Sequence, residues 1–378
     1  MTEPTPVRCP AVEHPDAPPA DPAALEPLLA RLADPAPVAA DEEFPLGTLR
    51  SDGRLDLCKQ GLGLPGALRA IPAATASPHA AHLLLGTNAV GTPGARALAD
   101  ALTPGHGLHT LYLGCNRIDA DGATALADRL ADDDTVRALW LKRNPIGDTG
   151  VRALAAALAR NHRIRTLDLV NTGLTAHGLR ALLDVLRDRP VPLDRIFLGG
   201  NGLGPDTAPL LAALLRQARV RELYAPANHL GDAGATVIAA AVDPDRPVTL
   251  GLGGNGIGPD GALALADALG GIEALDLGRP PSERTLGAPA NATGDEGLAA
   301  LAAAVPGSPL RRLEVRHTGI THRGASRVLA AVAGGSRLEY VGLGPGVPRR
   351  TKRAIAPFLN PAAPAADDDV RMIASRYR

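Results

Sequence analysis

One apolar phrase recurs at a nearly constant interval through most of this 378-residue chain. It is clearest at residues 108–116, which read LHTLYLGCN, and at residues 136–144, which read VRALWLKRN. From Gln60 to Asn255 the last position of the phrase recurs at steps of 28, 28, 28, 28, 29, 27 and 27 residues. So regular a period predicts a solenoid, in which each repeat packs against its neighbours, and not a globule around a single core.

Each repeat is predicted to contain a strand followed by a helix. Leu139 and Leu141 share one face of a short strand, because side chains alternate along a strand. Leu154 and Leu158 follow ten and fourteen residues after Asn144, and this i, i+4 spacing places them on one side of a helix. Eleven repeats are expected, and their phrases end at Gln60, Asn88, Asn116, Asn144, Thr172, Asn201, Asn228, Asn255, Pro280, Thr318 and Gly346.

The turn between strand and helix has its own pattern. A glycine such as Gly150 stands six residues after the end of the phrase, where the absent Cβ lets the first helical turn approach the sheet. The asparagine side chain is expected to bond backbone groups where the strand ends. Four polar residues are expected to be N-caps of their own helices, namely Thr92, Asp148, Asp232 and Asp295.

These residues resemble the ribonuclease-inhibitor-type leucine-rich repeat, whose units match L-x-x-L-x-L-x-x-N and carry full helices. The resemblance covers about 300 of the 378 residues. It implies an α/β horseshoe with a parallel sheet on the concave face and helices on the convex face. It also implies a protein-binding module without catalytic chemistry. The chain departs from the eponymous inhibitors because it is not strongly acidic and has only three cysteines, so ribonuclease inhibition is not carried over.

The period also predicts the domain organisation. Residues 1–40 form a flexible Pro/Ala-rich lead with one short helix around residues 23–33. Residues 41–359 form the repeat domain, with a capping unit at each end that shields the apolar edge. An insertion at about 278–290 interrupts the period, either as a tolerated loop or as a contact loop on the binding rim. Residues 360–378 form a tail with a possible short helix.

Composition excludes several classes of function. A formal net charge of −1 produces no global field that favours nucleic acid or an anionic membrane. The chain has no run of 18 apolar residues, and its start lacks a secretory signal pattern. Cys9, Cys58 and Cys115 lack C-x-x-C spacing, which predicts reduced thiols and a cytoplasmic protein. The protein is expected to be monomeric.

No cofactor, metal or catalytic residue is predicted. The G-x-G-x-x-G matches at residues 61–66 and 256–261 have the phase of ordinary repeat turns. His79, His82, His106 and His109 are interpreted as solvated side chains at strand entries, because the cysteines cannot complete a zinc site with them. The basic run at residues 349–353 is interpreted as the solvated face of a capping helix.

The residue between the two strand leucines points away from the core, and this column contains four of the eight aromatic residues. Exposed aromatic side chains with a neighbouring arginine are typical of interface hot spots. The alternative is that the rings only stack across strands to cover the sheet. The predicted partner-binding residues on the concave face are Tyr112, Trp140, Lys142, Asp168, Arg195, Phe197, Glu222 and Tyr224.

The sequence therefore predicts a non-enzymatic scaffold that binds a protein partner through its concave face, with Trp140 as the anchor. A second hypothesis is a regulator of a small GTPase, because Ran GTPase-activating proteins share this repeat subtype. A third is nucleic-acid binding through the basic run, but no aromatic platform lies among those residues. Acceleration of GTP turnover would favour the second hypothesis, and strongly salt-dependent binding to DNA or RNA would favour the third.

Overall fold

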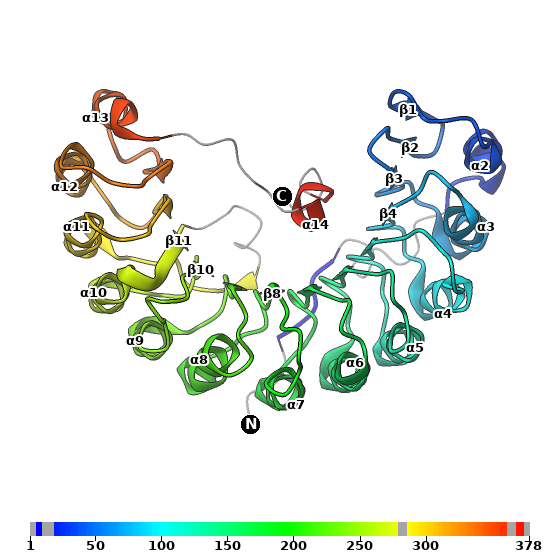
Figure 1. Cartoon of the computed structure of the whole chain (residues 1–378), viewed down its shortest axis with the longest axis horizontal. Helices are drawn as coiled ribbons and strands as arrows, with labels where there is room; N and C mark the ends of the chain where they lie inside the picture. The colour runs from blue at the N-terminus through cyan, green and yellow to red at the C-terminus, as the bar shows by residue number, and fades with distance from the viewer. Residues whose placement is uncertain (1–4, 10–18, 279–285, 361–367, 374–378) are drawn as a thin grey trace. The chain divides into compact units, whose positions relative to one another are not determined.

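The computed structural model describes residues 5–9, 19–278, 286–360 and 368–373, which form two compact units. Unit 1 contains the described residues up to Leu193 together with the C-terminal segment, residues 368–373. Unit 2 contains the described residues from Asp194 to Asn360. In both units short strands alternate with helices, and the strands lie side by side on one layer with the helices on the other (Figure 1). The predicted α/β leucine-rich repeat solenoid is confirmed as the fold class.

Unit 1 begins with a 3-10 helix at Pro22–Leu25 and an antiparallel hairpin that pairs with the first parallel strand. Its strands are β1 (Glu42–Glu43), β2 (Thr48–Leu49), β3 (Arg54–Asp56), β4 (His82–Leu84), β5 (Thr110–Tyr112), β6 (Ala138–Trp140) and β7 (Thr166–Asp168). Its helices are α2 (Glu26–Ala33), α3 (Gly63–Ala76), α4 (Gly91–Ala101), α5 (Ala120–Leu130), α6 (Gly147–Arg160), α7 (Ala176–Leu186) and α14 (Asp368–Arg371).

Unit 2 repeats the same alternation, with strands that pair in parallel. The strands are β8 (Arg195–Phe197), β9 (Glu222–Tyr224), β10 (Val248–Gly251), β11 (Ile272–Asp276), β12 (Arg312–Glu314) and β13 (Tyr340–Gly342). The helices are α8 (Ala208–Arg216), α9 (Gly231–Ala239), α10 (Pro259–Asp267), α11 (Gly294–Ala304), α12 (His322–Ala333) and α13 (Arg349–Ile355). Short 3-10 helices lie at Pro205–Thr207, Leu269–Gly271 and Ala356–Phe358.

The core of each unit lies between its strand layer and its helix layer. Leu139 and Leu141 are buried, and so are Leu154 and Leu158 on the facing side of α6. This confirms the two apolar pairs that the repeat predicts. Within the described part of the chain, no helix has the length and apolarity needed to cross a membrane.

A ladder of buried asparagines closes the turn after most of the strands. Asn144 donates from Nδ2 to the carbonyls of Leu113 (2.9 Å) and Leu141 (3.0 Å). Its Oδ1 accepts from the backbone N–H groups of Asn116 (2.9 Å) and Ile118 (3.0 Å). The side chain therefore satisfies backbone groups of its own repeat and of the preceding one, as the sequence predicts.

The insertion in unit 2 shows where the repeat pattern resumes. Pro280, the predicted ladder position, lies outside the described residues. Asn291 takes that place, because its Oδ1 accepts from the N–H groups of Asn255 (2.8 Å) and Ile257 (3.0 Å). Its Nδ2 donates to the carbonyls of Leu252 and Leu277. The ladder position of this repeat is thus Asn291 and not Pro280.

Three aspartates that were predicted to be N-caps of their own helices are not N-caps, and all three differ from the prediction in the same way. Asp148, Asp232 and Asp295 lie in the first turns of α6, α9 and α11, and each carboxylate instead caps the helix of the next repeat. Asp232 Oδ1 accepts from the N–H groups of Gly258 (2.7 Å) and Gly261 (2.9 Å) at the start of α10. The N-cap of α10 is a glycine without a side chain, so the preceding repeat supplies the acceptor.

The two other aspartates act in the same way on threonine N-caps. Asp148 accepts from the N–H and the hydroxyl of Thr175 at the start of α7. Asp295 does the same for Thr321 at the start of α12. The helices of consecutive repeats are therefore joined by carboxylate caps as well as by apolar packing.

The N-terminal residues 5–9 differ from the expected flexible lead. Cys9 is buried and forms a disulfide with Cys115, which contradicts the expectation that these two thiols are reduced. The backbone N–H of Arg8 donates to Asn171 Oδ1, and Asn171 Nδ2 donates to the carbonyl of Pro6. This segment is thus attached to the turns that follow β5 and β7. The domain boundaries and the cytoplasmic location stay predictions, and the disulfide removes the thiol argument for that location.

Candidate functional site

The strand face, defined as the side of each strand layer that faces away from the helices, carries the predicted binding residues. In unit 1, Tyr112 pairs in register with Trp140, and Trp140 pairs with Asp168. The structure therefore brings these three together as neighbours, as the repeat spacing predicts. Their exposure was predicted wrongly, because Tyr112 is 5% exposed and both Trp140 and Asp168 are 0% exposed.

The end of the chain lies against the neighbouring strand of this face, β7. Figure 1 shows α14 on the side of the unit 1 strands opposite the helices. The hydroxyl of Thr166 in β7 donates to Asp369 Oδ2 at 3.2 Å. Met372 and Ile373 are 4% and 0% exposed. A contact between positions 203 residues apart has no periodic signal, so the sequence could not predict it.

Lys142 extends the predicted site beside Trp140. Its Nζ lies 5.9 Å from the centroid of the Tyr112 ring, which places the ammonium over the aromatic face. Burial lowers the pKa of Lys142 to about 8, while the negative charge of Asp168 acts in the opposite direction. The side chain is only partly exposed, so its charge is weakly hydrated and its contacts within unit 1 hold it in place.

Unit 2 assembles the other four predicted residues into one cluster. Arg195 binds Glu222 through both Nε (3.2 Å to Oε2) and Nη2 (2.9 Å to Oε1). The hydroxyl of Tyr224 donates to Glu222 Oε2 at 3.0 Å. The rings of Phe197 and Tyr224 stack with centroids 4.5 Å apart and planes 6° from parallel. Paired guanidinium and carboxylate groups thus hold a stacked aromatic pair.

The exposure of this cluster differs from that in unit 1. The Glu222 side chain is 27% exposed and Tyr224 is partly exposed, whereas Arg195 and Phe197 on the adjacent strand are buried. Gly251 lies beside Tyr224, and a Cβ there would meet Tyr224 Cδ1 at 2.6 Å. Burial and the adjacent Glu222 charge raise the pKa of Tyr224, so the phenol stays protonated and donates to the carboxylate.

A second polar cluster on the unit 2 strand face was not predicted as part of the site. Glu314 Oε2 accepts from Arg316 Nε (2.8 Å) and from the Tyr340 hydroxyl (2.9 Å). The Arg312 guanidinium lies 4.8 Å from the Tyr340 ring centroid. Glu314 also lies over Gly342, where a Cβ would collide with its carboxylate. Gly342 stands at the position between the two apolar residues of its strand, where most other repeats have a larger side chain. This glycine was the sequence signal that could have indicated the arrangement.

Asp276 lies beside Glu314 in register and has an unusual protonation equilibrium. Burial, followed by the Glu314 charge, raises the pKa of Asp276 to about 7 from 3.8. The folded protein therefore resists ionisation of this carboxyl. The resulting cost in stability is absent below the unfolded pKa, grows as the pH rises towards 7, and is constant above it.

We expect Asp276→Asn to stabilise unit 2 by about 1–2 kcal/mol at pH 8, because the amide removes this cost and partial exposure screens it. The amide oxygen can still accept the bond from the Gly278 N–H. Urea unfolding at pH 5 and pH 8 measures the gain, which should be smaller at pH 5. Asp267→Asn, at the exposed end of α10, is the matched control and should change stability by less than about 0.5 kcal/mol. Equal gains from Asp276→Asn at both pH values would contradict the argument.

The histidines at the strand entries are not all solvated, contrary to expectation. His106 is buried, and its Nε2 lies 2.6 Å from Asp133 Oδ2. Burial alone would raise the pKa of Asp133, but hydrogen bonds from His106, Val136 and Thr135 outweigh it and lower that pKa. His82 is also buried, with Nδ1 2.9 Å from Thr110 Oγ1. Among the residues that the structure describes, no three His, Cys, Asp or Glu side chains gather to hold a metal ion.

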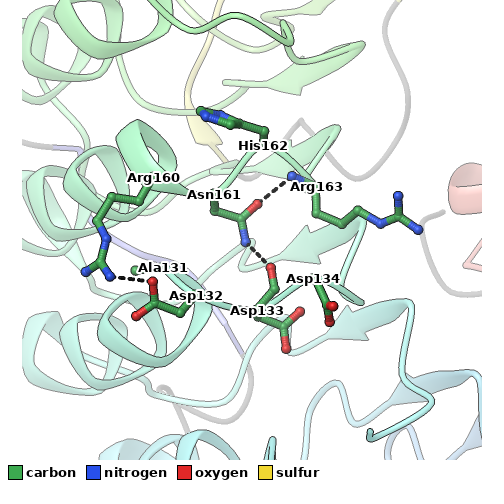
Figure 2. A pocket seen from close by; sticks show the side chains of 8 residues that line it. All are labelled: Ala131, Asp132, Asp133, Asp134, Arg160, Asn161, His162 and Arg163. Atoms are coloured by element: carbon green, nitrogen blue, oxygen red, sulfur yellow. Dashed lines mark hydrogen bonds and ion pairs between the residues drawn. The ribbon is translucent and has the colours of Figure 1, made fainter. Parts of the chain in front are cut away.

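A shallow hollow opens between the loops that precede β6 and β7 (Figure 2). In it Asn161 Nδ2 donates to the carbonyl of Asp133 at 2.8 Å, and Asn161 Oδ1 accepts from the Arg163 N–H at 2.8 Å. Arg160 forms an ion pair with Asp132. These bonds connect two consecutive repeats, so we assign the lining residues a structural role.

Comparison with known proteins agrees with this fold. The family model described as Leucine Rich repeat matches residues 108–127, 135–155 and 248–266. The structure of a yeast complex of Rad7 and Elc1 is similar with a TM-score of 0.52 and 14% identity, covering 81% of this chain and 73% of that one. Actin-binding site 2 of leiomodin-1 matches with a TM-score of 0.33 and 16% identity, covering 40% of this chain and 87% of that one. The search of curated proteins found no match. The family match and the fold similarity to the Rad7–Elc1 structure support a leucine-rich repeat protein.

Proposed function

We propose that this chain is a non-enzymatic scaffold of the ribonuclease-inhibitor-type repeat subfamily that binds a protein partner through its strand face. The observation that carries the proposal is the unit 2 cluster of Arg195, Phe197, Glu222 and Tyr224. Stacked rings and a bidentate Arg–Glu pair are held in place before any partner arrives. Such preorganisation reduces the entropy that binding must overcome.

The chemistry of the cluster also suits a protein surface. Tyr224 presents an apolar ring and a polar edge, and Arg and Tyr are enriched among residues that dominate binding energy. Glu222 keeps part of its carboxylate exposed, which favours a partner with a basic or hydrogen-bond-donating group at that point. Tyr112, Trp140 and Asp168 of unit 1 are buried, so they would contribute to binding only if the residues that cover them moved away.

The experiment uses the full chain to capture proteins from a lysate and then measures each purified candidate by calorimetry. Tyr224→Ala should weaken the affinity of a true partner at least about tenfold, or about 1.4 kcal/mol. Asp267→Lys, on the exposed helix side of unit 2, is the matched control and should leave the affinity unchanged. Circular dichroism verifies that both variants are folded. A candidate that binds Tyr224→Ala as tightly as wild type would contradict the proposed surface. The small-GTPase regulator stays a prediction, which a GTP-turnover assay tests.

A further inference from the structure

The C-terminal segment, residues 368–373, belongs to unit 1 although it follows unit 2 in the sequence. A helix of four residues is not stable by itself in water, so its order must come from the surface on which it lies. That surface is the strand face of unit 1, where Thr166 donates to Asp369. The segment is thus docked by tertiary contacts and not by its own helical propensity.

Burial on both sides of this contact is nearly complete. Met372 and Ile373 are 4% and 0% exposed, and the Trp140 ring on the strand face is 0% exposed. A large ring on the outer side of a strand layer loses its last exposed area only when something covers it. Burying side chains of this size contributes about 1.5–3 kcal/mol each. Burial of Met372 and Ile373 is therefore expected to supply most of the docking energy, while the Asp369 bond sets the position.

We propose that the strand face of unit 1 is a peptide-binding site and that residues 368–373 are its resident ligand. The proposal rests on the proposed scaffold function and specifies the kind of partner. The partner presents a short helical segment with a carboxylate and, three and four residues later, two apolar side chains, as Asp369, Met372 and Ile373 do. It binds by displacing the C-terminal segment.

The segment itself shows which of its positions matter. Asp369, Met372 and Ile373 are buried, whereas Arg371 is exposed and Val370 is partly exposed. The buried positions are spaced i, i+3, i+4 along α14 and the turn that follows it, the spacing that places side chains on one side of a helical turn. Covalent attachment gives the segment a high effective concentration at the site. An external segment must therefore bind more tightly than the resident one, or act when the resident one has been released.

Trp140 provides a direct readout, because it is the only tryptophan in the chain. In the full chain carrying Met372→Asp and Ile373→Asp, we expect its emission to shift to longer wavelength and acrylamide quenching to rise several-fold. Far-UV circular dichroism and the melting temperature should stay close to wild type. Phe358→Asp, which changes an exposed apolar residue in unit 2, is the matched control and should leave the emission unchanged. If the double variant unfolds, Asp369→Ala provides the same test with a smaller change.

A synthetic peptide of residues 366–378 then tests the site as a receptor. Added to the double variant, it should reverse the emission shift with a saturating dose response, whereas a scrambled peptide should not. Wild type should bind the peptide at least about tenfold more weakly, since its site is occupied. Unchanged Trp140 shielding in a folded double variant, or no saturable response to the peptide, would overturn the inference. Neither result depends on Tyr224, so the proposed scaffold function would still be decided by its own binding experiment.

Discussion

Replacing Trp140 by alanine is expected to lower the free energy of unfolding of unit 1 by about 3–5 kcal/mol. The indole is 0% exposed, lies between Tyr112 and Asp168 in register, and is covered on its outer side. Truncation leaves a cavity that the rigid strand layer cannot close. Chemical denaturation followed by far-UV circular dichroism measures the change, because the variant lacks tryptophan fluorescence.

The control for this variant is Phe358→Ala, which removes a ring that is 42% exposed and should cost less than about 1 kcal/mol. The loss in free energy of unfolding for Trp140→Phe should lie between the losses for Trp140→Ala and Phe358→Ala, because the variant retains an aromatic ring in the same place. A cost below about 1 kcal/mol for Trp140→Ala would mean that the indole is not packed as the structure has it. Because Trp140 is buried, its truncation cannot serve as a test of binding alone.

The second large effect is expected from Asn144→Ala. Removing the side chain leaves two buried carbonyls, of Leu113 and Leu141, and two N–H groups, of Asn116 and Ile118, without these bonds. An unsatisfied buried polar group costs about 1–3 kcal/mol, and water entry will recover part of the total. We therefore expect unit 1 to lose at least about 3 kcal/mol in urea unfolding.

Asn360→Ala is the matched control, because Asn360 is exposed and its side chain makes only a long bond of 3.4 Å to the carbonyl of Ser336. It should change stability by less than about 0.5 kcal/mol. Asn144→Asp keeps the acceptor oxygen Oδ1 but replaces the donor Nδ2 by a second oxygen that faces the carbonyls of Leu113 and Leu141, so a loss at least as large as that of Asn144→Ala would support the bonding scheme. A loss no larger for Asn144→Ala than for Asn360→Ala would contradict the structural role of the ladder.

The repeat period predicted the parts of the fold that local spacing determines. Leu139, Leu141, Leu154 and Leu158 are buried where their alternation and i, i+4 spacing place them. The ladder asparagines follow in the same way, because each recurs at a constant offset from its strand. The insertion separates the strand phrase, whose last position falls at Pro280, from the turn pattern, which resumes at Asn291. The bonds of Asn291 to Asn255 and Ile257 show that it takes the ladder position.

Part of the candidate site could be predicted for the same reason. Arg195 and Glu222 stand 27 residues apart, one repeat, so parallel pairing brings them together. Exposure could not be predicted in this way. Alternation indicates which face of a strand carries Trp140, but it contains no information on what lies above that face. The docking of Asp369 on Thr166 depends on a distant, non-periodic segment.

The carboxylate caps have a consequence for how such a chain can change. Asp148, Asp232 and Asp295 each complete the start of a helix that belongs to the following repeat. A repeat excised at its own boundaries would leave this acceptor behind, and the transplanted helix would begin with unsatisfied amides. Engineered shortening or duplication of the array should therefore place its junctions ahead of the aspartate, so that each acceptor stays with the helix that it completes.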